Sequence, residues 1–97
     1  MENITTNTRS TAISTAPYPA SILFVIEGNF GGGTATLQWS EKKDSEASWS
    51  TVKESGDVDV IRSADSNGVI GVGTVGYLSV LVAGATTPNI NLSLIGR

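Results

Sequence analysis

Three aspartates, Asp57, Asp59 and Asp65, are the nearest that this sequence comes to a metal-binding or acid–base cluster. Asp57 and Asp59 are two positions apart, so a strand would place both side chains on one face, where a hard cation could bridge them. A calcium site needs about six to eight oxygen ligands, and the D-x-D-x-D-G loop pattern is absent. We therefore expect a solvated strand face here and no metal site.

Residues 71–76 read GVGTVG and match the G-x-G-x-x-G pattern of dinucleotide-binding proteins. That site requires a helix whose N-terminus holds the pyrophosphate, and an acidic residue about 20 positions further on. Here residues 77–83 read YLSVLVA, which is typical of a strand, and no acidic residue follows Asp65. These glycines therefore indicate a bulge or loop and not a nucleotide site.

The sequence contains neither His nor Cys. The usual nucleophile–base pairs therefore cannot be built, and the usual zinc sites and disulfides are excluded. A Ser–Lys pair would have to use Lys42 or Lys43, which lie in an exposed, charged segment at 41–48. We expect a protein that is not an enzyme and that needs no cofactor.

Charge is sparse and unevenly distributed along the 97 residues. Charged residues make up 15% of the chain, and the net charge is −3, whereas soluble domains average roughly 25% charged residues. The six basic residues form no stripe, which argues against nucleic-acid binding. No apolar run approaches the roughly 20 residues of a membrane span. Residues 66–97 carry one charge, at Arg97, which indicates a surface covered by the rest of the fold or by another protein.

Residues 1–20 read MENITTNTRSTAISTAPYPA and contain few apolar side chains. Such a segment buries too little apolar surface to order by itself, and Pro17 and Pro19 favour an extended chain. Two interpretations stay open: a disordered tail, or an extended arm that orders against a neighbouring subunit. The segment lacks the basic and apolar regions of a signal peptide, so we expect synthesis in a cytoplasm.

Residues 21–97 predict one all-β domain. The segment 34–40 alternates strictly, with Ala35, Leu37 and Trp39 on the core face. Five consecutive apolar residues at 22–26 indicate a strand that is buried on both faces or lies at an interface. The Gly-rich link at 28–33 predicts a hairpin between these two strands.

Further strands are expected over 49–53, 58–61, 69–72, 77–83 and 89–95, with a tight turn at the Asn67-Gly68 pair. In the last of these segments Ile90, Leu92 and Leu94 should face inward. The pattern predicts a single small antiparallel β-sandwich or barrel of about seven to eight short strands, preceded by an extended N-terminal arm.

From residue 21 onward the order of these features resembles the small β-sandwich structural proteins of tailed bacteriophage virions. Three stretches carry the likeness: FGGGTATLQWS at 30–40, WSTV at 49–52, and YLSVLVAGATTPNIN at 77–91. The resemblance implies a protein made in the host cytoplasm that decorates or cements the capsid surface by binding the major capsid protein. It also implies a homotrimer with an N-terminal arm that reaches across neighbouring subunits.

For that role we expect partner-binding residues near the arm and in the charge-poor strands: Tyr18, Ile22, Phe24, Tyr77, Leu78 and Val80. Two alternatives stay open. One is a head–tail or tail connector, which would form a closed ring. The other is a fibre-borne carbohydrate-binding module, with Trp49, Tyr77 or the 41–48 loop as an exposed platform.

Overall fold

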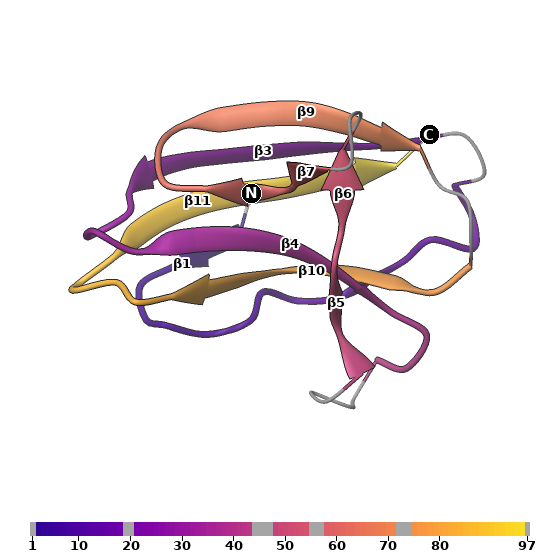
Figure 1. Ribbon diagram of the computed structural model, residues 1–97, viewed down its shortest axis with the longest axis horizontal. Helices are drawn as coiled ribbons and strands as arrows, with labels where there is room; N and C mark the ends of the chain where they lie inside the picture. The colour runs from indigo at the N-terminus through magenta and orange to yellow at the C-terminus, as the bar shows by residue number, and fades with distance from the viewer. Residues whose placement is uncertain (1, 19–20, 44–47, 55–57, 72–74, 97) are drawn as a thin grey trace.

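The computed structural model describes residues 2–18, 21–43, 48–54, 58–71 and 75–96. These residues form an all-β sandwich of two antiparallel sheets (Figure 1), which confirms the predicted fold class. Within the described residues, no helix is long and apolar enough to cross a membrane.

Sheet A has the strand order β1-β11-β3-β9, with these bounds: β1 Glu2–Ile4, β11 Asn89–Gly96, β3 Ser21–Asn29 and β9 Ser66–Gly71. Sheet B has the order β2-β10-β4-β5, and β8 also pairs with β4: β2 Ile13–Ser14, β10 Tyr77–Ala83, β4 Thr34–Ser40, β5 Ser50–Thr51 and β8 Ile61–Arg62. A small separate hairpin joins β6 (Lys53–Glu54) to β7 (Val58–Asp59).

Strand β3 faces the core on one side only. Ile22, Phe24 and Ile26 are buried, whereas Leu23 and Val25 are half-buried on the opposite face. Of the two alternatives expected for this strand, burial on both faces is therefore not observed within the chain, since alternate residues of a strand point to opposite sides of a sheet, and a place at an interface stays a prediction.

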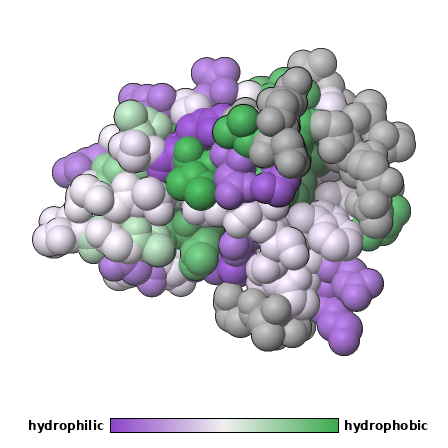
Figure 2. Space-filling view, in the orientation of Figure 1, coloured by the Kyte–Doolittle hydropathy of each residue, from purple (hydrophilic) through white to green (hydrophobic). Residues whose placement is uncertain are grey.

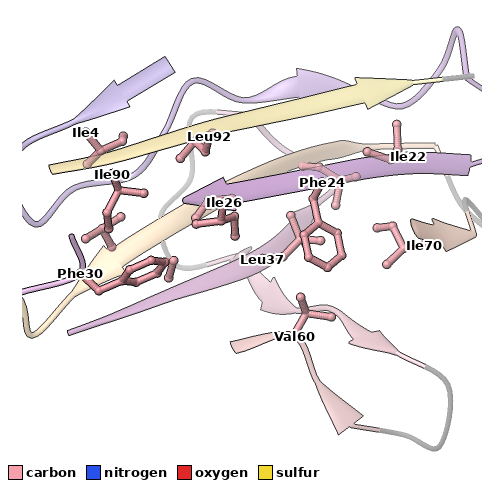
Figure 3. Close-up of a cluster of buried hydrophobic side chains, with 14 residues drawn as sticks. Ile4, Ile22, Phe24, Ile26, Phe30, Leu37, Val60, Ile70, Ile90 and Leu92 are labelled. Carbon is pink, nitrogen blue, oxygen red and sulfur yellow. The ribbon is translucent and has the colours of Figure 1, made fainter. Parts of the chain in front are cut away.

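Phe24 is the largest fully buried side chain. Its ring points from β3 toward Leu37 and Val60 (Figure 3). Gly68 lies opposite Phe24 on β9, and a Cβ at Gly68 would lie 2.7 Å from the ring. Gly68 is therefore a strand residue that leaves room for Phe24, and the predicted tight turn at Asn67-Gly68 is wrong.

Two crossovers link the sheets at one end of the sandwich. Strand β3 belongs to sheet A and β4 to sheet B, so the predicted hairpin between them is wrong. Gly28, Gly31 and Gly32 of this crossover have positive φ, which glycine adopts without steric cost. In the second crossover, at 84–88, the backbone N–H of Thr86 donates to the carbonyl oxygen of Gly31 at 2.9 Å. This contact holds the two crossovers together.

Residues 2–16 are built into the sandwich instead of forming an arm outside it. Glu2–Ile4 pairs with β11 in sheet A, and Ile13–Ser14 pairs with β10 in sheet B. The radius of gyration is 12.5 Å, close to the roughly 13 Å of a compact domain of about 100 residues. The boundary expected between an arm at 1–20 and a domain at 21–97 therefore does not describe this arrangement.

The strands over Thr34–Ser40 and Tyr77–Ala83 have the predicted bounds, and the last strand extends one residue further, to Gly96. Ile90 and Leu92 are buried and Leu94 packs against the core, as predicted. The segments expected at 49–53 and 58–61 form shorter strands than predicted.

The Gly68→Ala variant should lose about 1–3 kcal/mol of unfolding free energy, the usual cost of overpacking a core, because its Cβ collides with the Phe24 ring. Urea denaturation of the variant and the wild type measures this loss. Asn67→Ala is the matched control, since Asn67 is the exposed neighbour in the same strand and should change stability by only about 0.5 kcal/mol. Equal stability of the two variants would contradict the packing role of Gly68.

Candidate interaction surface

Four of the six predicted partner-binding residues belong to the core. Ile22, Phe24 and Val80 are 0% exposed, and Leu78 is 2% exposed. These positions were expected to offer apolar surface to a partner, but the two sheets of the same chain cover them. They are therefore not available for contact with another protein in this structure.

The two tyrosines of that group are half-buried. Tyr18 packs against the core, and its ring lies so close to Gly96 that a Cβ at Gly96 would overlap it. Tyr77 lies in β10 between Ser14 and Ser40 of the neighbouring strands. The structure therefore places Tyr18 in a packing role at the end of β11.

The acidic residues are dispersed. Asp59 accepts an ion-pair contact from Lys53 at 2.6 Å on the exposed β6–β7 hairpin. Asp65 accepts a hydrogen bond from the backbone N–H of Gly28 at 2.8 Å, and Asp57 lies outside the described residues. In the part of the chain that the structure describes, no three His, Cys, Asp or Glu residues gather to hold a metal ion.

The Gly-rich motif at 71–76 is described only at its ends, because residues 72–74 lie outside the described ranges. The segment that follows it is strand β10 and not a helix, so the helix N-terminus that a pyrophosphate site needs does not occur there. The backbone N–H of Gly76 donates to Thr15 Oγ1 at 2.8 Å. The end of this motif thus anchors the N-terminal segment.

Arg9 lies across the outer face of sheet B. Its Nη1 donates to Ser79 Oγ and its Nη2 to Gln38 Oε1, each at 2.7 Å. Its guanidinium carbon lies 4.3 Å from the centroid of a Trp49 ring, a favourable cation–π distance. Because Arg9 occupies one face of Trp49, the expected sugar platform at Trp49 is at least half covered.

The outer face of sheet A carries an apolar row formed by Val69, Leu23 and Ile95. Leu23 of the middle strand pairs with both of the others, and directly opposite residues share a face of the sheet. Val69 is 59% exposed and Ile95 is 51% exposed. Val25 lies on the same face, one pleat away, between Asn67 and Ser93. We call Val69, Leu23, Ile95 and Val25 the apolar row.

Charge is nearly absent around the apolar row. On the outward positions of β3, β9 and β11, Glu27 is the one charged residue among those described. Green, apolar residues are visible on part of the upper edge of the molecule in Figure 2, in the region of β9 in Figure 1, with purple and white residues along the rest of that edge. Exposed apolar residues grouped on one face, unlike scattered ones, are a mark of an interaction surface.

The sequence did contain a signal for this surface. The run at 22–26 has apolar residues at every position, whereas a strand with one solvated face needs them only at alternate positions. The excess residues, Leu23 and Val25, are the ones that face outward. The sequence alone did not show which of the five would point away from the core.

Comparison with protein families, with curated proteins and with solved structures gives no match for this chain. The functional argument therefore depends on the surface geometry described above and on the likeness in the order of sequence features. Among the described residues, the apolar row brings exposed apolar side chains of neighbouring strands together on one face of a sheet.

The Arg9→Ala variant should lose about 1–3 kcal/mol of unfolding free energy, because the buried Ser79 hydroxyl loses its charged donor. Thermal or urea denaturation measures this loss, and tryptophan fluorescence should change as the guanidinium leaves Trp49. Thr8→Ala is the control, since the exposed Thr8 contributes its backbone carbonyl, which accepts from Val82 N–H at 2.9 Å. If Arg9→Ala is as stable as Thr8→Ala, the Arg9 side chain does not stabilise the packing of the N-terminal segment on sheet B.

Proposed function

We propose that this protein is a non-enzymatic structural protein of a tailed-phage virion, which decorates or cements the capsid by binding the major capsid protein. The observation that carries the proposal is the apolar row on the outer face of sheet A. A face with so little charge fits an apolar protein surface far better than a nucleic acid or an anionic membrane. The likeness in feature order from residue 21 onward directs the choice of partner to a capsid lattice.

The binding free energy that the apolar row can supply favours attachment to a repeated lattice. Full burial of one exposed Val, Leu or Ile side chain contributes about 1.5–3 kcal/mol, and two of the four residues in the apolar row are already half-buried. The row alone therefore supplies at most several kcal/mol, against the roughly 8 kcal/mol of a micromolar complex. Binding at many equivalent sites, with neighbouring copies in contact, raises the total through multivalency.

The use of polar groups also supports a structural role. Arg9 donates hydrogen bonds to Gln38 and to Ser79, and the buried Ser10 and Thr15 hydroxyls accept from the backbone N–H groups of Val80 and Gly76. These hydrogen bonds join the N-terminal segment to sheet B. A catalytic site would need converging polar groups that are held ready for a substrate.

The resemblance implies an N-terminal arm that contacts neighbouring subunits, and the proposal does not use such an arm. The N-terminal segment pairs with both sheets of its own chain, so the proposed capsid contact uses the sheet face and does not depend on a separate arm. The homotrimer stays a prediction. A connector ring is the alternative that native mass spectrometry separates from it by copy number.

The Val69→Asp variant should reduce saturable binding to undecorated, expanded capsids of a candidate host phage by at least tenfold. The charge would have to be buried against an apolar partner, which costs several kcal/mol unless it is paired. Co-sedimentation with increasing protein concentration measures the effect.

Val58→Asp on strand β7 is the matched control, since Val58 is 56% exposed and Val69 is 59% exposed. The same charge on a strand that does not belong to sheet A should leave binding unchanged. Equal binding by both variants, or binding lost only in the control, would contradict the proposed docking face. Circular dichroism should show that both variants are folded.

A further inference from the structure

Half of strand β11 has an open edge. Along its whole length β11 pairs with β3 on one side, from Asn89 to Gly96. On its other side β1 covers only Ile90 to Leu92, and no other described strand pairs with the residues beyond them, 93–96. An edge strand presents unpaired backbone N–H and C=O groups, which favour pairing with another strand.

A shallow groove runs beside this open edge. Its volume is about 260 Å³, and it is lined by side chains of β11 and of the N-terminal segment: Glu2, Thr11, Ile13, Leu92, Ser93, Leu94 and Ile95. Glu2 is the one charged residue in this lining, and its carboxylate already accepts from Thr11 N–H at 3.0 Å. The groove is therefore suited to a neutral, extended segment with small or apolar side chains.

We propose that the open edge of β11 pairs antiparallel with the same edge of a second copy of this chain. In such a two-fold pairing, opposite residues must share a face of the sheet, and the position at the centre faces itself. With Ile95 at the centre, Leu94 of one copy lies opposite Gly96 of the other. This register uses only residues beyond β1, and it joins the two copies of sheet A into one continuous sheet.

The apolar row argues for a second copy and against an unrelated strand. The row Val69–Leu23–Ile95 crosses sheet A and ends at Ile95, on the open edge. In the proposed pairing Ile95 meets its own copy, so the row continues without interruption into the second sheet. A single pairing thus covers the exposed Ile95 and doubles the length of the apolar row.

The inward side of the strand is also self-complementary. Leu94 lies opposite Phe24 and so faces the core side, where it is only half-buried. Beyond the edge, the Leu94 side chain of the second copy would enter the groove beside Ile13. It would lie opposite Gly96 and beside the Tyr18 ring, which packs over Gly96.

The other open edge of sheet A is less suited to pairing. It belongs to β9, where Arg62 Nε donates to Ser66 Oγ at 2.7 Å. A charged side chain at a strand edge opposes pairing with another strand. Residues 93–96 of β11 carry no charge, and Arg97 is the one charged residue that follows them in the sequence.

Pairing over so few residues buries far less than the roughly 1,200–2,000 Å² of a stable complex. We therefore expect weak, concentration-dependent dimers in solution. The inference is independent of the capsid proposal, because it is tested with the purified protein alone. On a lattice, the same contact would join neighbouring copies.

The Ile95→Cys variant tests the register, because the wild-type chain contains no Cys. In the proposed dimer the two introduced thiol side chains face each other with Cβ atoms about 4.5–5.5 Å apart, near disulfide distance. Under mild oxidation this variant should form a covalent dimer at least ten times faster than Val69→Cys. The Val69 positions would be five strand spacings apart, about 24 Å.

Val69→Cys is a matched control, since both residues are exposed on the same face of sheet A. Cross-linking of the two variants at equal rates would overturn the edge pairing, as would faster cross-linking through position 69.

Sedimentation equilibrium of the wild type gives a second measurement of the pairing. A protein that stays monomeric up to millimolar concentration would also contradict the inference, whatever its capsid binding. Ile95→Asp should abolish any dimer that is seen, since two like charges would then face each other.

Discussion

A two-layer sandwich buries only one face of each strand, and β3 has apolar residues on both. This constraint governs the arrangement of the molecule. Ile22, Phe24 and Ile26 fill the space between the sheets, so Leu23 and Val25 must lie outside. The outer face of sheet A is therefore apolar as a consequence of the sequence of β3 and of the number of layers. Val69 and Ile95, on the neighbouring strands, extend it.

The N-terminal segment fastens the two layers together at their edges. It begins beside β11, where Ile4 enters the core, and continues beside β10, where Ser10 and Val80 exchange hydrogen bonds. Backbone pairing and polar contacts order this segment, together with the buried Ile4 side chain and the partly buried Ile13 and Tyr18. The segment covers most of the β10 edge but only half of the β11 edge, and the open half is where a second strand fits.

Alternation made much of the fold predictable from the sequence. Strands β4 and β10 have the expected bounds because period-two patterns and flanking glycines define them. Pairing between distant segments was not predictable in the same way. The glycine-rich link at 28–33 has the composition of a hairpin, yet it crosses between sheets, and Gly68 serves the Phe24 ring and not a turn. The N-terminal order comes from backbone hydrogen bonds, which composition does not reveal. Four apolar residues expected at an interface lie in the core, because the sequence pattern did not show that the two sheets of the same chain would cover them.

The most direct test of the account is carbene footprinting of the protein, free and on undecorated, expanded phage capsids. The account predicts that labelling of Val69 and Leu23 falls severalfold on the capsid, while labelling of Val58 on the β6–β7 hairpin is unchanged. Protein that sediments with capsids and is labelled equally at Val69 in both states would contradict the docking face. Protein that does not sediment with the capsids would contradict the capsid proposal itself.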